Sequence, residues 1–311
     1  MFAPVGHTMG VAPRRAAPSR TIVAVIVACC FALALGIATS AGHPSAAGQL
    51  PGLRLVQRVP AHQHGGHRDR TEMVAITSSL RACEARLEAQ PRRVPTLAIV
   101  GASFTAGTGP GNPELSWAVV LARLLRWNAV IIGVPGAGYV APGSDKRGPV
   151  DGMLSQERLR ALAPDVVIVQ AGHDDVGQPA AGETRRVRAA VDLIRSAAPK
   201  ARIALVTVFT RDSLVATPAL RAIDQVIVTA GKAADRRIII MDPLTGRWKF
   251  PRARPGGLHP SAAGDAWIAH KVADILSAYG VQPAQVDATV PVICDVAVSV
   301  PKRAADTDRD A

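Results

Sequence analysis

The chain is poor in aromatic residues, which make up 4% of its 311 residues. Its formal net charge of +12 comes mostly from scattered Arg side chains, and no stretch interleaves basic with aromatic residues. Because single-stranded nucleic acids are bound by basic grooves with stacking aromatic rings, this composition argues against a nucleic-acid partner. The excess charge is interpreted as a compositional trait that suits contact with acidic envelope polymers. The core must be built mainly from Ala, Val, Leu and Ile.

Cysteine is also scarce, with four residues and no pair at metal-ligand spacing. The sequence therefore predicts neither a metal site nor a cofactor. Cys29 and Cys30 lie within an apolar leader, which leaves Cys83 and Cys294 in the remainder of the chain. We expect these two to form a disulfide, as two cysteines do in an oxidising compartment. A catalytic thiol is the less favoured alternative.

One long apolar run is present, from Thr21 to about Ala38, and Arg14, Arg15 and Arg20 precede it. A basic segment followed by an apolar one is typical of an export signal, and this run is nearly long enough to cross a bilayer. Residues 1–40 are thus predicted to be a signal peptide or a membrane anchor. Both readings make the protein extracytoplasmic, either secreted or associated with the cell envelope. Whether the leader is cleaved stays open.

The rest of the chain divides by composition. Residues 41–70 are rich in Gly, Pro, His and Ala and are predicted to be a flexible linker, with the three His of HQHGGH as incidental members rather than metal ligands. Residues 71–300 form the predicted domain, flanked by a helix over Thr71–Gln90 and by an apolar, strand-like tail at 288–300. The charged residues 301–311 are predicted to be disordered.

Within the domain, apolar strand-like runs alternate with helical patterns. Such alternation predicts an α/β domain with a five-stranded parallel sheet covered by helices on both faces. The predicted strands are 96–100, 129–134, 165–170, 202–208 and 237–241, and the predicted helices are 113–126, 153–162, 182–197, 217–233 and 261–279.

Polar and glycine-rich stretches follow several of these strands. The first, GASFTAGTGP, places Ser103 directly after the first strand, and later stretches carry Gly136, His173 and His259. Because the carboxyl ends of parallel strands meet at one edge, these residues can converge there. A lone Ser after a strand is more often a turn former or helix cap, and a lone His is more often structural. Their joint occurrence favours a nucleophile with its base.

Four short blocks then resemble the SGNH, or GDSL-type, hydrolases, in the order that this family has. They read Gly101-Ala102-Ser103-Phe104, a block with Gly136, then Gly172-His173-Asp174-Asp175, and finally Gly256-Gly257-Leu258-His259-Pro260. The resemblance covers about residues 95–280. It implies a flavodoxin-like three-layer α/β/α sandwich and hydrolysis of acyl esters.

The resemblance also implies roles for the matched residues. Ser103 would be the nucleophile and His259 the general base, while the backbone N–H groups of Ser103 and Gly136 would bind the oxyanion. Two positions depart from the family pattern: Asp174 stands where an Asn completes the oxyanion hole, and Gly256 stands where an acid orients the His. An ionised Asp174 would repel an oxyanion.

The missing acid leaves three readings open: a Ser–His dyad held by a backbone carbonyl, one held by another carboxylate, or an inactive site. Asp242, after the fifth predicted strand, is one substitute, although Asp-Pro after a strand commonly forms a turn. The first hypothesis is an exported serine esterase acting on acylated lipids or glycans. The alternatives are a catalytically weak protein that binds such a ligand, and an acyltransferase. The acyl length, the alcohol and the oligomeric state are not predicted.

Overall fold

The structure is a computed structural model that describes residues 80–90, 94–146, 148–210, 216–285 and 291–297. The predicted leader, linker and charged tail lie outside the described residues, as does the first part of the predicted helix over 71–90. Within the described part of the chain, no helix is both long and apolar enough to span a bilayer.

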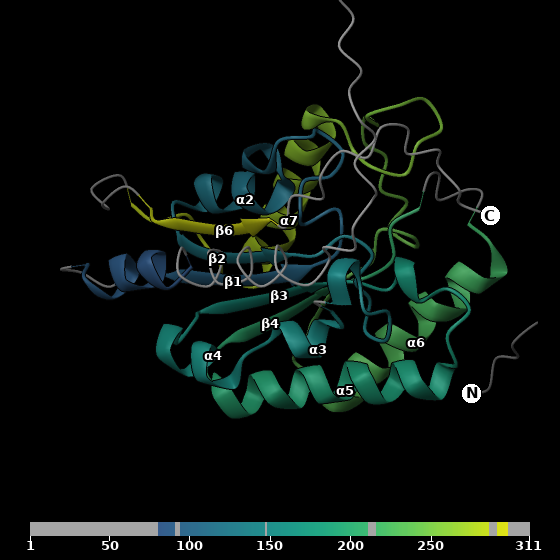
Figure 1. Ribbon diagram of the computed structural model, residues 1–311, viewed down its shortest axis with the longest axis horizontal. Helices are drawn as coiled ribbons and strands as arrows, with labels where there is room; N and C mark the ends of the chain where they lie inside the picture. Colours follow the sequence, from purple (N-terminus) through teal and green to yellow (C-terminus); the bar gives the residue numbers. More distant parts are fainter. Residues whose placement is uncertain (1–79, 91–93, 147, 211–215, 286–290, 298–311) are drawn as a thin grey trace, which may run out of the picture. The chain divides into compact units, whose positions relative to one another are not determined.

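The centre of the fold is a fully parallel sheet with the strand order β5-β4-β3-β1-β2-β6 (Figure 1). Strands β1 to β4 are apolar between their end residues and almost fully buried, as expected for a sheet covered on both faces. The strands are β1 Thr96–Gly101, β2 Asn128–Gly133, β3 Val166–Gln170, β4 Arg202–Val206, β5 Ile239–Met241 and β6 Ile293–Ala297.

The predicted count of five strands is wrong, because the sheet has six. The additional strand β6 comes from the apolar tail and pairs in parallel with β2, with Cys294 opposite Val130. The tail was expected to be strand-like, but nothing in its residues specifies which strand it pairs with. It pairs with β2 because the edge of β2 is free in the folded sheet, and that edge exists only in the tertiary structure.

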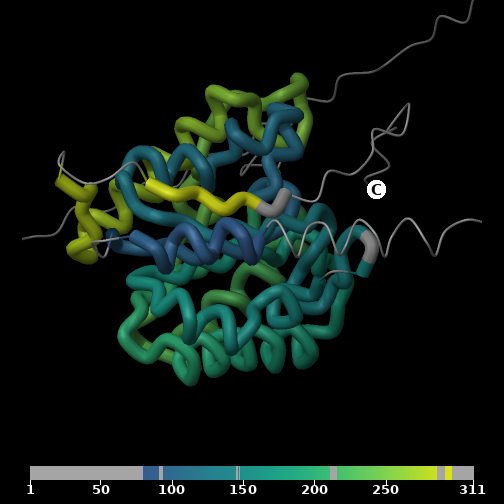
Figure 2. Tube along the Cα trace, turned by 60° about the vertical axis from the view of Figure 1, so that its left-hand side comes forward, coloured from purple at the N-terminus to yellow at the C-terminus, as the bar shows by residue number. Residues whose placement is uncertain are grey.

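Helices cover both faces of the sheet, which gives the expected three layers (Figures 1 and 2). The helix formed by residues 80–88 packs beneath β2 and β6, where Leu80 contacts the cluster of Val130 and Cys294. The pair α2 and α7 lies on one face, and α3 to α6 lie on the other. Their bounds are η1 Pro113–Leu115, α2 Trp117–Leu125, η2 Ser144–Lys146, α3 Val150–Met153, α4 Gln156–Leu162, η3 His173–Asp175, α5 Ala180–Ala197, α6 Pro218–Ala234 and α7 Ala262–Ala278.

Side-chain caps set the starts of four of these helices. The hydroxyls of Ser116, Ser155, Thr217 and Ser261 each accept a backbone N–H three residues later, at the starts of α2, α4, α6 and α7. Ser and Thr at this position satisfy donors that have no partner within the helix. Caps at Ser116 and Ser155 also explain why two predicted helices, 113–126 and 153–162, are each divided in two.

The two faces of the sheet are filled differently. On the α2 and α7 face, all of the described Phe and Trp side chains lie in or against one buried cluster. On the α3 to α6 face the cluster is aliphatic, and Tyr139 is its one aromatic member.

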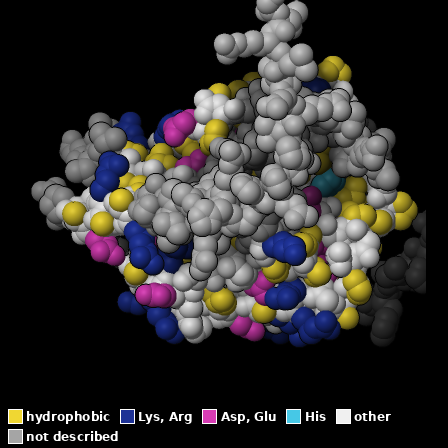
Figure 3. Space-filling view, in the orientation of Figure 1, with side chains coloured by type: hydrophobic (Ala, Val, Ile, Leu, Met, Phe, Trp, Pro, Cys, Tyr) yellow, Lys and Arg dark blue, Asp and Glu magenta, His cyan; other side chains and the backbone are white. Residues whose placement is uncertain are grey.

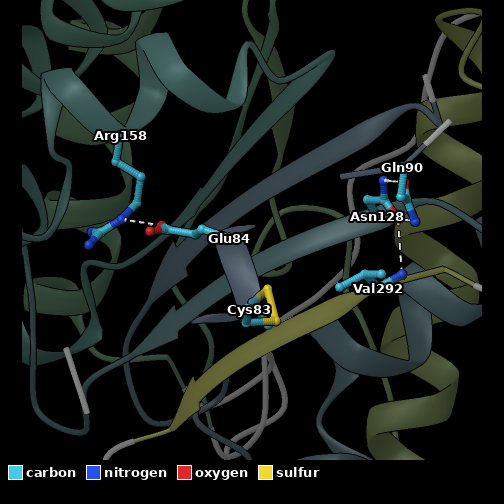
Figure 4. Close-up of a disulfide and its surroundings, with 7 residues drawn as sticks. Cys83, Glu84, Gln90, Asn128, Arg158 and Val292 are labelled. Carbon is cyan, nitrogen blue, oxygen red and sulfur yellow. Dashed lines mark hydrogen bonds and ion pairs between the residues drawn. A yellow bond between two sulfur atoms is a disulfide. The ribbon is translucent and has the colours of Figure 1, made fainter. Parts of the chain in front are cut away.

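The edge of the sheet beside β6 is cross-linked. Cys83 forms the expected disulfide with Cys294 across a sequence separation of 211, and Glu84 pairs with Arg158 of α4 at 2.6 Å (Figure 4). The side chain of Asn128 bridges two segments there, accepting the Val292 N–H at 2.9 Å and exchanging hydrogen bonds with Gln90. These contacts fix the two ends of the domain to its edge.

Candidate active site

Ser103 follows β1 in a turn that is held by the neighbouring strand. Gln170, at the end of β3, accepts the N–H of Ala102 through both its backbone and its side-chain oxygen, and its side-chain oxygen also accepts the Thr105 hydroxyl at 2.9 Å. A Cβ at Gly101 would lie 2.2 Å from Thr105 Oγ1, so only glycine fits before the turn. Sequence reasoning missed Gln170, although a polar residue at the end of an apolar strand was a signal for it.

The structure brings Ser103 and His259 together. The Nε2 atom of His259 lies 2.9 Å from Ser103 Oγ, within hydrogen-bond distance, although the two residues are 156 positions apart. Ser103 is 8% exposed, so the residue is largely shielded from solvent. A His at this distance can accept the proton of a serine hydroxyl.

His259 is carried by a folded-back loop between β5 and α7. The N–H of Ala253 donates to the His259 carbonyl at 3.0 Å, and the N–H of Ser261 donates to the Pro251 carbonyl at 2.9 Å. The loop after Ser103 packs against it so closely that a Cβ at Gly109 would lie 3.1 Å from His259 Cβ and 1.9 Å from the Pro260 oxygen. Backbone contacts thus determine where the imidazole stands.

Aromatic rings support this pair from within the core. Phe104, next to Ser103, stacks on Phe209 with ring centroids 4.2 Å apart, and it contacts His259 at 5.5 Å. Phe250 meets both Phe rings edge-on, at 6.3 Å and 5.8 Å. Such offset and edge contacts are favourable beyond the burial of the rings. Few aromatic residues exist in the chain, and three of them gather around Ser103 and His259.

Arg252 fastens the same loop. Its guanidinium donates to the Leu258 carbonyl and, at 2.6 Å, to the Thr210 carbonyl, and it stands 3.9 Å over the ring of Phe250. Charge-assisted hydrogen bonds of this kind are stronger than neutral ones. Arg252 thereby joins the His259 loop to the segment after β4.

Gly136 and Asp174 follow β2 and β3, the two strands that flank β1 in the sheet. They therefore stand on either side of the strand that ends at Ser103. Gly136 has a φ of +75°, which glycine adopts without strain. Asp174 is half-buried within η3. The placement is compatible with the oxyanion roles that the resemblance implies.

Asp175, a residue the sequence reasoning passed over, holds these two loops together. It is fully buried, and its carboxylate accepts the backbone N–H groups of Tyr139, Val140 and Ala141 at 2.7, 3.0 and 2.8 Å. The approach is so close that a Cβ at Gly138 would lie 2.1 Å from the carboxylate. The signal for it was a second acidic residue immediately after Asp174.

Three further candidates were weighed in the sequence: Asp242, His173 and Gly256. Asp242 accepts both the N–H and the hydroxyl of Thr245 and so caps its own turn, as its Asp-Pro sequence suggested. The Nδ1 atom of His173 lies 3.0 Å from the Phe209 carbonyl, which suits a structural role. Gly256 has a φ of +66°, and a Cβ there would meet nothing within 4 Å.

Among the described residues, no group of three or more His, Cys, Asp or Glu side chains could hold a metal ion. The His residues of HQHGGH lie outside the described residues.

The comparison with known families decides the classification. Residues 99–267 match the model of the GDSL-like lipase/acylhydrolase family. The chain belongs to this family. It is therefore an SGNH-type hydrolase that acts on carboxylic esters, and the predicted α/β sandwich with a parallel sheet is confirmed.

Three individual proteins that resemble the chain are 18–28% identical to it. The GDSL lipase Rv0518 of Mycobacterium tuberculosis is 28% identical over 199 residues, covering 60% of this chain and 83% of the relative. A family two carbohydrate esterase from Clostridium thermocellum, in complex with cellohexaose, is 18% identical with a TM-score of 0.47, covering 62% of this chain and 67% of the other. The salicylyl-acyltransferase SsfX3 from a tetracycline biosynthetic pathway is 18% identical with a TM-score of 0.48, covering 63% and 58%.

Proposed function

We propose that the protein is an exported serine esterase in which Ser103 is the nucleophile and His259 the general base. The observation that carries the proposal is the distance of 2.9 Å between Ser103 Oγ and His259 Nε2. A serine hydroxyl is a weak nucleophile unless an adjacent base removes its proton.

The reaction would proceed through an acyl-enzyme. Ser103 Oγ attacks the ester carbonyl carbon while His259 Nε2 accepts the hydroxyl proton, and the carbonyl oxygen becomes an oxyanion. His259 then returns the proton to the departing alcohol as the C–O bond breaks. A water molecule, deprotonated by the same imidazole, attacks the acyl group and releases the carboxylic acid and free Ser103.

The oxyanion would be bound by the backbone N–H groups of Ser103 and Gly136. Asp174 stands where the family has a third donor, and a carboxylate there opposes the developing negative charge. Loss of one such donor costs about 10²–10³ in rate in a serine hydrolase. The position of the orienting acid is held by Gly256, which has no side chain to offer. We therefore expect the enzyme to hydrolyse its esters slowly.

The proposed substrates are acyl esters of lipids or glycans. Family membership supports the ester bond, and the name of the mycobacterial relative supports acyl lipids as one of the two classes. The disulfide between Cys83 and Cys294 supports an extracytoplasmic location, because such bonds persist in oxidising compartments. Association with the cell envelope, through the segment 1–40, belongs to the same proposal.

A second function is favoured by the two departures from the family pattern. With Asp174 and Gly256 in place, the same site could bind an acylated ligand and turn it over too slowly to matter. Acyl transfer to an alcohol other than water uses the same acyl-enzyme and differs only in the acceptor.

Labelling with a fluorophosphonate separates an activated serine from a binding site. We expect the full chain to be labelled at Ser103, and Ser103→Ala to lose both labelling and hydrolysis of p-nitrophenyl esters from acetyl to long acyl chains. Ser196→Ala, on the exposed side of α5, is the matched control.

His259→Ala should likewise lose activity, whereas His270→Ala, an exposed histidine of α7, should not. Hydrolysis by Ser103→Ala at the parent rate would overturn the proposal.

The substrate class needs its own assay. Release of fatty acid from phospholipid or triacylglycerol and release of acetate from acetylated glycan would be measured side by side with the same preparation. Transfer would show as an acyl ester of added glycerol rather than free acid.

A further inference from the structure

We propose that Glu183 is a positioning residue for the reaction: it donates a proton to Asp175 and so fixes the loop that carries Gly136 against the turn that carries Asp174. The inference rests on the proposed function, because these two loops matter to catalysis only if they border the oxyanion.

The first part of the argument is the set of donors around Asp175. Three consecutive backbone N–H groups, of Tyr139, Val140 and Ala141, point at its two oxygens. A carboxyl group whose oxygens receive three donors acts as an acceptor, so a second carboxyl group that adjoins it must supply the proton of any hydrogen bond between them. Asp175 is thus the acceptor in any pair that it forms.

The second part is the position of Glu183. It lies in the first turn of α5, which packs against the loop held by Asp175: a Cβ at Gly182 would lie 4.0 Å from Val140 Cγ2. Its side chain is fully buried, and among the described residues no donor group reaches either of its carboxyl oxygens, while the carboxyl group of Asp175 adjoins it. Two ionised carboxylates cannot share a hydrogen bond, because neither can donate. Since Asp175 is the acceptor, the shared proton belongs to Glu183.

The surroundings keep that proton in place. Burial, the neighbouring charge of Asp175 and the hydrogen bond to it raise the pKa of Glu183 to about 8. The other titratable group facing the pair is Tyr139, whose pKa burial raises well above its usual value, so its hydroxyl stays neutral. Arg186, three residues further along α5, forms an ion pair with Asp151 of α3 at 2.6 Å with half of its side chain exposed. Among the described residues Glu183 forms no ion pair, and Asp175 is the acidic group that adjoins it.

The consequence for the site is mechanical. The clamp at Asp175 fixes residues 139–141 of the β2 loop, three positions after Gly136, and Asp175 is the immediate neighbour of Asp174. A buried hydrogen-bonded network of this kind holds one arrangement when every member is satisfied. Removing the donor from Glu183 takes away one of the groups that hold Asp175 and loosens the clamp, and displacements of about 1 Å at a catalytic group can cost about 10² in rate.

The pH dependence follows from the sign of the pKa change. Because the folded protein holds this proton up to a higher pH than the unfolded chain, the stability from Glu183 is complete below pH 4.5 and is lost as pH rises toward 8. Above pH 8 a second negative charge would adjoin Asp175.

Two variants of the full chain test the proposal. Glu183→Gln keeps a donor toward Asp175 but cannot ionise, and Glu183→Met fills similar volume without donating. Both are compared with the parent for kcat and KM on p-nitrophenyl acetate, and for Tm, between pH 5 and 9.5.

Glu183→Gln should keep kcat within about threefold at pH 7, and its Tm and kcat should decline less than those of the parent above pH 7. Glu183→Met should lower kcat about 10²-fold with KM nearly unchanged, because the affected contact is made in the transition state. A parent-like kcat in Glu183→Met, or a parent-like alkaline decline of Tm in Glu183→Gln, overturns the proposal.

The Tm measurement tests the role of Glu183 separately from the proposed esterase function. It is repeated in the Ser103→Ala background, where no hydrolysis is needed. If Ser103 proves not to be the nucleophile, the pH dependence of Tm still tests the shared proton. If Glu183→Met fails to fold, the Gln variant still decides the outcome through its pH profile.

Discussion

The two sides of the active site are supported by opposite kinds of chemistry. On the His259 side, Phe104, Phe209 and Phe250 form a stacked and edge-on cluster, and the guanidinium of Arg252 covers its outer ring. On the oxyanion side, Asp175 is buried against backbone N–H groups, next to a largely aliphatic core. One side is held by ring packing and the other by hydrogen bonds to a buried charge.

This difference follows the two faces of the sheet. Aromatic packing tolerates small changes in side-chain position, whereas a buried carboxylate with three donors accepts one geometry. In the proposed reaction the moving part is the His259 imidazole, which approaches Ser103 and then the leaving group, and it stands against aromatic rings. The fixed part is the pair of loops proposed to surround the oxyanion, and Asp175 holds it by hydrogen bonds. The surface adds no such contrast, since Figure 3 shows Lys and Arg interspersed with Asp, Glu and apolar side chains on the visible face.

The sharpest test of this comparison deletes one large buried side chain from each face. Phe209→Ala and Ile194→Ala should each destabilise the domain, by about 3–5 and about 2–5 kcal/mol. Only Phe209→Ala should also lower kcat in the folded protein at low temperature, because its ring contacts Phe104 beside Ser103. Denaturant unfolding and turnover on one soluble ester give the two readouts. Equal losses of kcat in both variants would show that the faces do not differ in this way.

On the oxyanion side, Asp174→Asn should raise kcat by up to about 10²–10³, because it replaces an opposing charge with a donor. Turnover on p-nitrophenyl acetate at pH 7 measures the gain. Asp192→Asn, an exposed carboxylate of α5, controls for the change in net charge. An unchanged or lower rate would mean that Asp174 does not face the oxyanion and that the third block is misaligned.

On the His259 side, Arg252→Met should leave two backbone carbonyls without their charged donor. Hydrogen bonds to a charged group contribute about 1.5–3 kcal/mol, less here because Arg252 is partly exposed. We expect a moderate fall in Tm and a loss of kcat of about tenfold or more, as the His259 loop loosens. Arg123→Met removes an exposed ion pair with Glu114 and should change neither. Parent-like kcat in Arg252→Met would remove Arg252 from the support of the site.

The smallest effect is expected at Gly256. A side chain there has open space, but the φ of +66° costs about 1 kcal/mol for a residue other than glycine. Asp and Asn tolerate this conformation about equally, so Gly256→Asn is the matched control for Gly256→Asp. The Asp variant should raise kcat severalfold if its carboxylate reaches His259, and the Asn variant should not. The same kcat in both variants would argue against a charge effect.

Much of the architecture could be predicted from local pattern. Alternating apolar runs indicated the parallel strands, and the glycine and polar residues after them indicated the edge where Ser103 and His259 meet. The disulfide between Cys83 and Cys294 could be predicted because these are the two cysteines outside the apolar leader. The limits of the five predicted strands were right to within two residues, because an apolar run and the turn residues beside it are local features of the sequence.

Other features required the folded chain. The sixth strand pairs with β2 because β2 has a free edge in the folded sheet. No residue of the tail specifies this partner. Gln170, Asp175, Glu183 and Arg252 are, in sequence, ordinary polar residues near strand or loop ends. Their partners lie 65, 35 and 42 residues away for Gln170, Asp175 and Arg252, respectively.

The sequence by itself thus determined which residue types stand at the edge of the sheet, since strand periodicity and turn residues act over a few positions. Only the tertiary structure decided which of them touch. The hydrogen bonds and ring contacts that hold Ser103, His259 and the oxyanion loops join segments from different strands. Their geometry depends on strand order and register, which arise when the whole core packs.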